Sequence, residues 1–127
     1  MFSHVMLGTD DMAASRAFYD ATLGTLGIKP GRTDAKERTA YVHPHGMLML
    51  TRPINGEPAC HANGGTVGFA AASPEAVDAW HAAGIAAGGT AIENLPGIRQ
   101  SPFGALYLAY LRDPAGNKLC AMHRPAA

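Results

Sequence analysis

The apolar residues of this chain fall into short runs, separated by segments rich in glycine, proline, asparagine and aspartate. Alternating apolar and polar positions predict half-buried strands, whereas apolar residues three and four apart predict helices. In the first half the pattern predicts a strand over residues 2–8, a helix over 12–23 capped by Asp10 or Asp11, and strands over 28–32, 39–43 and 47–51.

The second half repeats this order. It predicts a strand over 66–72, a helix that begins at Ser73-Pro74-Glu75, a short strand over 90–93, an insertion loop over 94–104, a long strand over 105–111 and a last strand over 119–122. The opening strands, and the apolar helix residues Phe18 and Trp80, are separated by the same 62 positions. Two structural copies in one chain are therefore expected.

The closing strands also correspond, because each follows a turn that contains proline and glycine. Placing Pro44 on Pro114 aligns Leu50 with Cys120. The predicted fold class is α+β, with two tandem β-α-β-β-β modules that form a curved mixed sheet around a cleft and place their helices outside. We expect a single domain over 1–127, with module one at 1–53, a linker at 54–64 and module two at 65–125.

Composition narrows the functional classes. Lysine plus arginine and aspartate plus glutamate number 10 each in 127 residues, so no basic patch for nucleic acid is expected. No apolar run is long enough to cross a membrane, and no signal peptide precedes the first strand, so a cytoplasmic location is expected. Without an export signal, Cys60 and Cys120 are expected to be reduced thiols.

Several segments together resemble the vicinal oxygen chelate superfamily of glyoxalase I, bleomycin-resistance proteins and extradiol dioxygenases. They are His4-Val5, Asp10-Asp11 with Phe18-Tyr19, the run from Gly64 to Phe69, Ala87-Gly88-Gly89, Pro96-Gly97-Ile98-Arg99, and the run from Arg112 to Lys118. The resemblance covers essentially the whole chain. It implies the two-module fold, but the superfamily contains many chemistries and some proteins that only bind a ligand.

The resemblance also implies where a divalent metal (Zn, Ni, Fe or Mn) would be held, because the superfamily's enzymes take one ligand from the first and last strand of each module. These positions fall on His4, Leu50, Thr66 and Cys120. Only His4 matches the enzyme pattern, which expects histidine at Thr66 and a carboxylate or glutamine at the other two. A histidine and a cysteine fall short of the three protein ligands of a typical catalytic zinc site.

His4 and Cys120 are the candidate catalytic residues. Arg99, after Pro96-Gly97, is a candidate clamp for a ligand carboxylate or phosphate. The predicted ligand-binding set also contains Thr66, Leu50 and one of the two tyrosines, Tyr107 or Tyr110, in the strand before the Asp113-Pro114 turn. We take Tyr107 as that tyrosine. Three of these residues also have a purely structural interpretation. His4 could be a half-buried, hydrogen-bonded histidine, Cys120 a small buried apolar residue, and Arg99 a solvated loop residue.

His43, His45, Cys60 and His61 have no metal-site spacing and are expected at the surface. The leading functional hypothesis is a glyoxalase-like protein that binds a small organic ligand in its cleft, with the usual metal site largely lost. The alternatives are a metal-dependent lyase or isomerase acting on a glutathione or thiol adduct, a dioxygenase, and a non-catalytic protein that sequesters its ligand. A homodimer is expected because the modules have exposed sheet edges.

Overall fold

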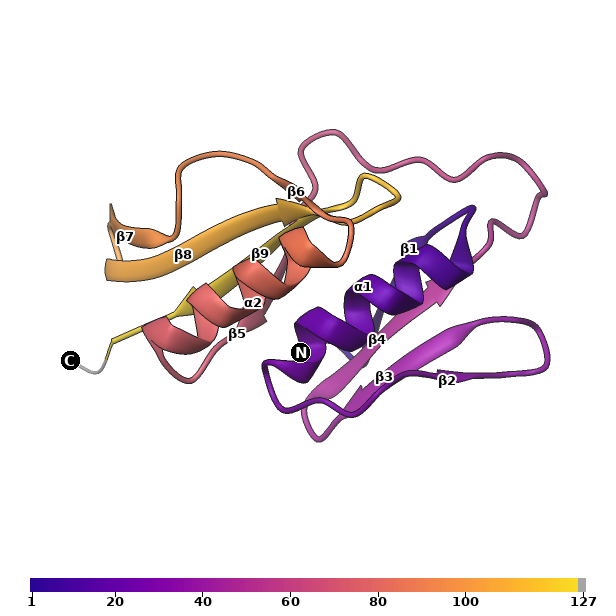
Figure 1. Ribbon diagram of the computed structural model, residues 1–127, viewed down its shortest axis with the longest axis horizontal. Coiled ribbons are helices and arrows are strands. Elements are labelled where there is room, and N and C mark those ends of the chain that lie inside the picture. Colours follow the sequence, from indigo (N-terminus) through magenta and orange to yellow (C-terminus); the bar gives the residue numbers. More distant parts are fainter. Residues whose placement is uncertain (126–127) are drawn as a thin grey trace.

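The chain forms two modules of the same design, described here for residues 1–125 of a computed structural model (Figure 1). The first contains β1 (His4–Gly8), α1 (Met12–Gly24), β2 (Arg32–Thr33), β3 (Thr39–His43) and β4 (Gly46–Thr51). The second contains β5 (Val67–Ala70), α2 (Pro74–Ala86), β6 (Thr90–Ala91), β7 (Gly97–Ser101), β8 (Gly104–Arg112) and β9 (Lys118–His123).

Each module contributes one mixed sheet. The strand order is β1-β4-β3-β2 in the first sheet and β5-β9-β8-β6 in the second, where β7 also pairs with β8. In both sheets the first strand of the module is parallel to its last strand, and the remaining pairs are antiparallel. The α+β class and the doubled module are therefore confirmed, with the strands in two sheets where the sequence predicted one.

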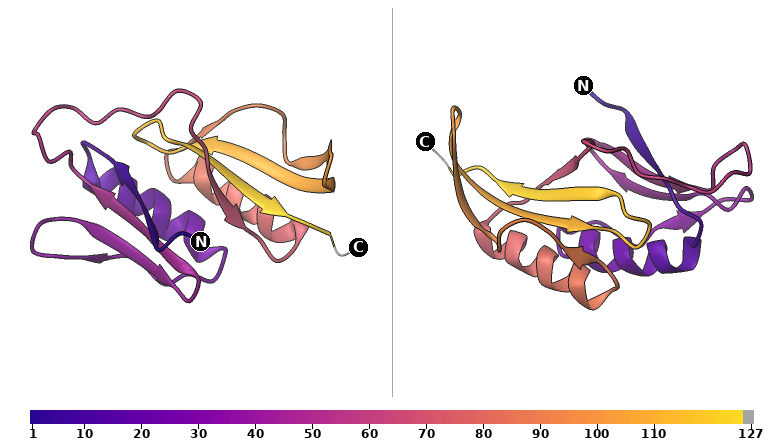
Figure 2. Two further views of the ribbon diagram at one scale, coloured as in Figure 1. Left: turned by 180° about the vertical axis from the view of Figure 1, so that it is seen from behind. Right: turned by 90° about the horizontal axis from the view of Figure 1, so that it is seen from above.

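The two helices lie side by side and cover the same side of both sheets (Figure 2). Both begin as expected, because Asp11 accepts a hydrogen bond from the Ala14 amide and Ser73 accepts one from the Ala76 amide. The opposite face of each sheet carries no helix, and we call it the open face. Among residues 1–125, no helix has the length and apolar character to span a membrane.

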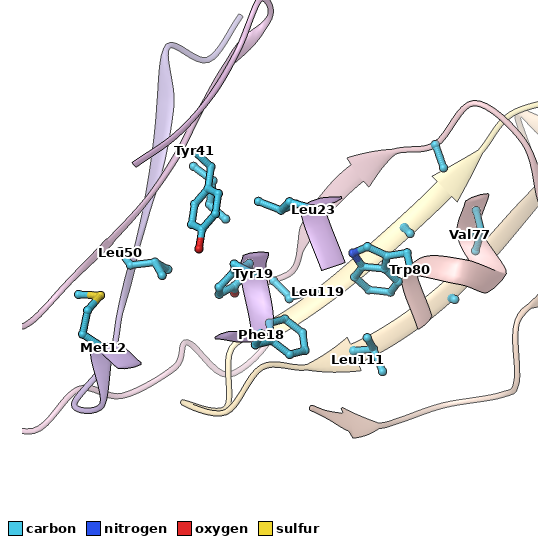
Figure 3. Close-up of a cluster of buried hydrophobic side chains, with 14 residues drawn as sticks. Met12, Phe18, Tyr19, Leu23, Tyr41, Leu50, Val77, Trp80, Leu111 and Leu119 are labelled. Carbon is cyan, nitrogen blue, oxygen red and sulfur yellow. The ribbon is translucent and has the colours of Figure 1, made fainter. Parts of the chain in front are cut away.

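One hydrophobic core joins the modules. Phe18 and Tyr19 of α1 are fully buried against residues of the second module, among them Trp80 and Leu111 (Figure 3). α2 packs closely at Gly84, where an added Cβ would lie 3.2 Å from Phe18 Cε2 of α1 and 2.3 Å from Leu111 Cδ1 of β8. The predicted core residues Phe18 and Trp80 are thus confirmed, and they belong to the same cluster.

A buried polar network crosses from one module to the other. Asp113, 3% exposed in the turn before β9, accepts hydrogen bonds from the Tyr19 hydroxyl (2.5 Å) and from the Asn117 side chain (2.9 Å). Its other oxygen accepts from the Ala115 and Asn117 amides, each at 2.9 Å. Asn117 Nδ2 also donates to the Gly8 carbonyl of β1 at 3.2 Å. The turn therefore fixes the second module against both α1 and β1.

Two segments differ from the expectation. Of the strand predicted over 28–32, only Arg32 is in a strand, the two-residue β2, because side chains of α1 take up the backbone groups before it: the Gly31 amide donates to Asp20 Oδ1, and Arg16 donates to the Gly31 carbonyl. The insertion loop contains β7, which pairs with β8 from Gly97 opposite Leu108 to Ser101 opposite Gly104.

Candidate functional site

A cavity of about 310 Å³ lies between the two modules. β1 and β5, which both line it, are each at the edge of their sheet. Its apolar lining comes from both modules and from the end of α1; it includes Val5, Leu23, Leu26, Ile28, Met47, Leu48, Val67 and Phe69. Ligand sites in proteins are commonly cavities of this kind, with apolar walls and few polar groups.

Three exposed histidines line the same cavity. His4 begins β1, His43 ends β3, and His45 lies in the turn between β3 and β4. The His4 Nδ1 is hydrogen-bonded to Ser3 Oγ at 2.8 Å, and the rings of His43 and His45 are 5.3 Å apart. Of the six predicted site residues, only His4 lines this cavity. The sequence correctly placed His43 and His45 at the surface but assigned them no site.

Cys120 lies on the open face of the second sheet. It is 7% exposed and packs in a small cluster with Leu106 and Leu108, against which Tyr110 and Met122 also pack. Burial raises the pKa of the Cys120 thiol, which opposes formation of the reactive thiolate. This environment agrees with the structural alternative for Cys120, a small buried apolar residue.

Arg99 and Tyr107 lie on different faces of the second sheet. Arg99 is opposite Leu106 in the β7–β8 pair and therefore shares the open face with Cys120, while its guanidinium donates to the Gly97 and Asn94 carbonyls. Tyr107 packs against the main core on the helix side, and its hydroxyl donates to Asp78 of α2 at 2.8 Å. Of the two tyrosines of β8, it is therefore Tyr110 that lies on the open face.

The strand register places Leu50 differently from the expectation. In the parallel pairs, Met6 lies opposite Met49 and Gly68 lies opposite Cys120. Met6 and Gly68 are 62 positions apart, the offset of the two copies, so the counterpart of Cys120 is Met49. Leu50 points to the opposite side of β4 and is 1% exposed in the core. A one-residue shift of register exchanges the faces of a strand.

Thr66 precedes β5 and is exposed beside Val67, which lines the cavity. The predicted residues thus occupy three places. His4 and Thr66 lie at or beside the cavity, Cys120 and Arg99 lie on the open face of the second sheet, and the other two lie on the helix side.

Comparison with known proteins agrees with the doubled fold. Residues 1–121 match the Glyoxalase/Bleomycin resistance protein/Dioxygenase superfamily. This chain belongs to that superfamily. No curated protein matches it.

Solved structures of the superfamily share the whole fold. A glyoxalase/bleomycin resistance protein from Albidiferax ferrireducens T118 is 60% identical, with a TM-score of 0.95 over 98% of this chain and 99% of that one. A lactoylglutathione lyase from Agrobacterium tumefaciens is 25% identical, with a TM-score of 0.66 over 97% of this chain and 92% of that one. A glyoxalase-related enzyme from Fulvimarina pelagi, 19% identical with a TM-score of 0.73 over 98% and 88%, shows the same fold.

The metal that the superfamily implies can be tested against the residues at its four positions. With the corrected register these are His4, Met49, Thr66 and Cys120, a set with one imidazole and one thiol. A thioether is a soft ligand and a neutral hydroxyl is a poor one, so the set lacks the donors that a catalytic zinc, nickel, iron or manganese ion requires. Within residues 1–125, moreover, no three side chains of histidine, cysteine, aspartate or glutamate are grouped as metal ligands. The residues present do not fit such a metal.

The cavity could not be predicted from the sequence, because the apolar residues of its walls have the same pattern as residues of a hydrophobic core. Val67 and Phe69 of β5 face Val5 and Leu48 of the first sheet across a gap that neither module encloses alone. Gly68 lies in this wall, but a single glycine in a strand does not by itself indicate a cavity.

Proposed function

We propose that this protein binds a small, largely apolar organic molecule in the cavity between its modules and does so without a metal. The observation that carries the proposal is the cavity itself, whose apolar walls are supplied by both modules and whose polar groups are few. A volume of about 310 Å³ is at the lower end of the usual range for small-molecule sites. The bound molecule is therefore small enough to be held between β1 and β5.

His4 is the predicted site residue that contacts the ligand in this proposal. It begins β1, its exposed ring lines the cavity, and its Nδ1 is hydrogen-bonded to Ser3 Oγ. Cys120 and Arg99 lie on the open face of the second sheet, and any role for them belongs to that surface. Since the Cys120 thiol has a raised pKa, we assign it no nucleophilic step.

Filling the cavity tests the proposal. Leu26→Trp enlarges a side chain that lines the cavity, and Leu95→Trp makes the same change at a leucine that is 78% exposed and does not line it. N-phenyl-1-naphthylamine, an uncharged apolar dye that fluoresces on leaving water, serves as the probe. We expect Leu26→Trp to weaken dye binding at least tenfold and Leu95→Trp to leave it unchanged. Equal binding by both variants would place the dye elsewhere and refute the proposal.

The alternative is a metal-dependent lyase acting on a glutathione or similar adduct. Its support is the 25% identical lactoylglutathione lyase, and the donor set of His4, Met49, Thr66 and Cys120 weighs against it. Elemental analysis of protein purified without chelator decides between the two. A near-stoichiometric metal that is lost in His4→Ala would favour the lyase, whereas metal-free protein that binds the dye favours the proposal above.

We further propose that the protein forms a homodimer through its open sheet faces. The open face of the first sheet is apolar and partly exposed, with Met6 41% and Val42 66% exposed and with Met47 and Met49 beside them. An exposed apolar face of this kind is usually covered by a partner. Light scattering at micromolar concentration should give twice the chain mass, and Met6→Lys, which places a charge on this face, should shift the mass toward the monomer.

A further inference from the structure

The polar side chains that line the cavity between the modules are imidazoles and hydroxyls, and the hydroxyl of Ser3 is hydrogen-bonded to His4 Nδ1 at 2.8 Å. They include the imidazoles of His4, His43 and His45, and the lining residues in the described part of the chain include no aspartate, glutamate, lysine or arginine. The lining residue Tyr41 already donates its hydroxyl hydrogen to Asp20 Oδ1 at 2.7 Å. A ligand therefore meets apolar walls and a group of histidines at one end.

A hydrogen bond to His43 determines which of its two ring nitrogens can donate to a ligand. The backbone amide of His45 donates to His43 Nδ1 at 3.2 Å, so this nitrogen is an acceptor and carries no hydrogen. The hydrogen of the neutral ring is then on Nε2, which is a donor to a ligand. The His45 ring lies next to it, with 5.3 Å between the ring centroids. The turn between β3 and β4 thus presents a donor beside a second imidazole.

The carbonyl groups at the end of α1 repel a negative charge in the cavity less strongly than unpaired helix-terminal carbonyls would. Leu23 and Leu26 of this segment line the cavity, and the last carbonyls of a helix carry partial negative charge. The Leu23 carbonyl, however, accepts hydrogen bonds from the Leu26 and Ile28 amides, and the Thr22 carbonyl accepts from the Thr25 amide and hydroxyl. These carbonyls are satisfied within the chain.

We infer that the ligand is an amphiphile, with an anionic head group such as a carboxylate or sulfonate bound by the histidines and an apolar body held between β1 and β5. The inference rests on the proposed function and adds the chemical class of the ligand. No carboxylate of the protein lines the cavity to accept hydrogen bonds from the histidines. Their N–H groups therefore favour a charged acceptor on the ligand, because hydrogen bonds to charged groups are about twice as strong as neutral ones.

Two dyes with the same apolar skeleton test this assignment. 8-Anilinonaphthalene-1-sulfonate carries an anionic head group, and N-phenyl-1-naphthylamine is the same skeleton without it. The double variant His43→Ala/His45→Ala removes both side chains of the turn, and His61→Ala is the matched control because His61 is an exposed histidine that does not line the cavity. Affinities are measured by fluorescence titration.

We expect the double variant to bind the sulfonate about tenfold more weakly and the uncharged dye within twofold of the parent protein, while His61→Ala changes neither. Unchanged sulfonate binding in the double variant would overturn the assignment, as would an equal loss for both dyes, since the histidines would then not distinguish charge. Failure of the proposed function is seen separately, as uncharged dye binding that Leu26→Trp does not reduce. A charge-dependent loss together with blockage by Leu26→Trp supports both proposals.

Discussion

Removing the hydroxyl of Tyr19 tests the network that holds the two modules together. Tyr19 is fully buried on α1, and its hydroxyl donates to Asp113 Oδ2 in the turn of the second module at 2.5 Å. Tyr19→Phe keeps the ring in the core, where it packs edge-to-face with Phe18 at 4.9 Å, and removes only this hydrogen bond. Asp113 keeps its other three donors.

The expected magnitude follows from the charge of the acceptor. A hydrogen bond to a charged group contributes about 1.5–3 kcal/mol, so Tyr19→Phe should lower the free energy of unfolding by roughly 2 kcal/mol. Asp113→Ala should cost more, about 3–5 kcal/mol, because it removes the acceptor of four hydrogen bonds and leaves buried donors unpaired.

Urea unfolding followed by circular dichroism measures these changes, and Tyr41→Phe is the matched control. Tyr41 also donates from its hydroxyl to a carboxylate, Asp20 at 2.7 Å, but this bond lies within the first module. In a double-mutant cycle with Asp113→Asn, Tyr19→Phe should show a coupling of about 1–2 kcal/mol, and Tyr41→Phe should be additive within about 0.5 kcal/mol. A stability change below about 0.5 kcal/mol for Tyr19→Phe, or equal coupling for both tyrosines, would refute the inter-module role.

Three further predictions concern the ionisation of Tyr19, the reactivity of the two cysteines and the packing at Gly84. Burial and then the neighbouring Asp113 raise the pKa of Tyr19 well above its ordinary value near 10, so the stability it contributes is present below about pH 10 and lost above it. Urea midpoints from pH 8 to 11 should therefore fall less steeply in Tyr19→Phe, and an unchanged slope would contradict this. Iodoacetamide at pH 8 should modify exposed Cys60 faster than Cys120, whose pKa burial raises, as read by peptide mass spectrometry; similar rates would contradict the packing of Cys120. Gly84→Ala should lower the free energy of unfolding by about 1–3 kcal/mol because its Cβ would overlap Leu111 of β8, whereas Gly24→Ala at the exposed helix end should not destabilise; a neutral Gly84→Ala would mean that Leu111 can repack around the added methyl group.

The doubled architecture could be predicted because it depends on local patterns that occur twice. The strand at 39–43 has the predicted bounds, Ser73 caps the second helix as predicted, and of the two candidates Asp10 and Asp11 it is Asp11 that caps the first. β7 was missed because Arg99, Gln100 and Ser101 have no strand pattern of their own. They form a strand only because β8 pairs with them.

The side of β4 predicted for Leu50 was wrong because the two turns were aligned incorrectly. Matching Pro44 to Pro114 assumes turns of equal length, but two residues separate β3 from β4 whereas five separate β8 from β9. The strands after the turns are therefore offset by 71 positions, one more than the turns suggested, and a single residue reverses the side to which each side chain points. The length of each turn depends on where pairing between its two flanking strands begins, and the residue pattern alone did not fix that point.

A crystal structure of the protein with N-phenyl-1-naphthylamine would show where an apolar ligand lies. If the cavity between the modules is the binding site, density for the dye will lie between β1 and β5, against Val67 and Phe69, with the turn between β3 and β4 at one end. Density confined to the open faces of the sheets, around Met49 or Cys120, would contradict it.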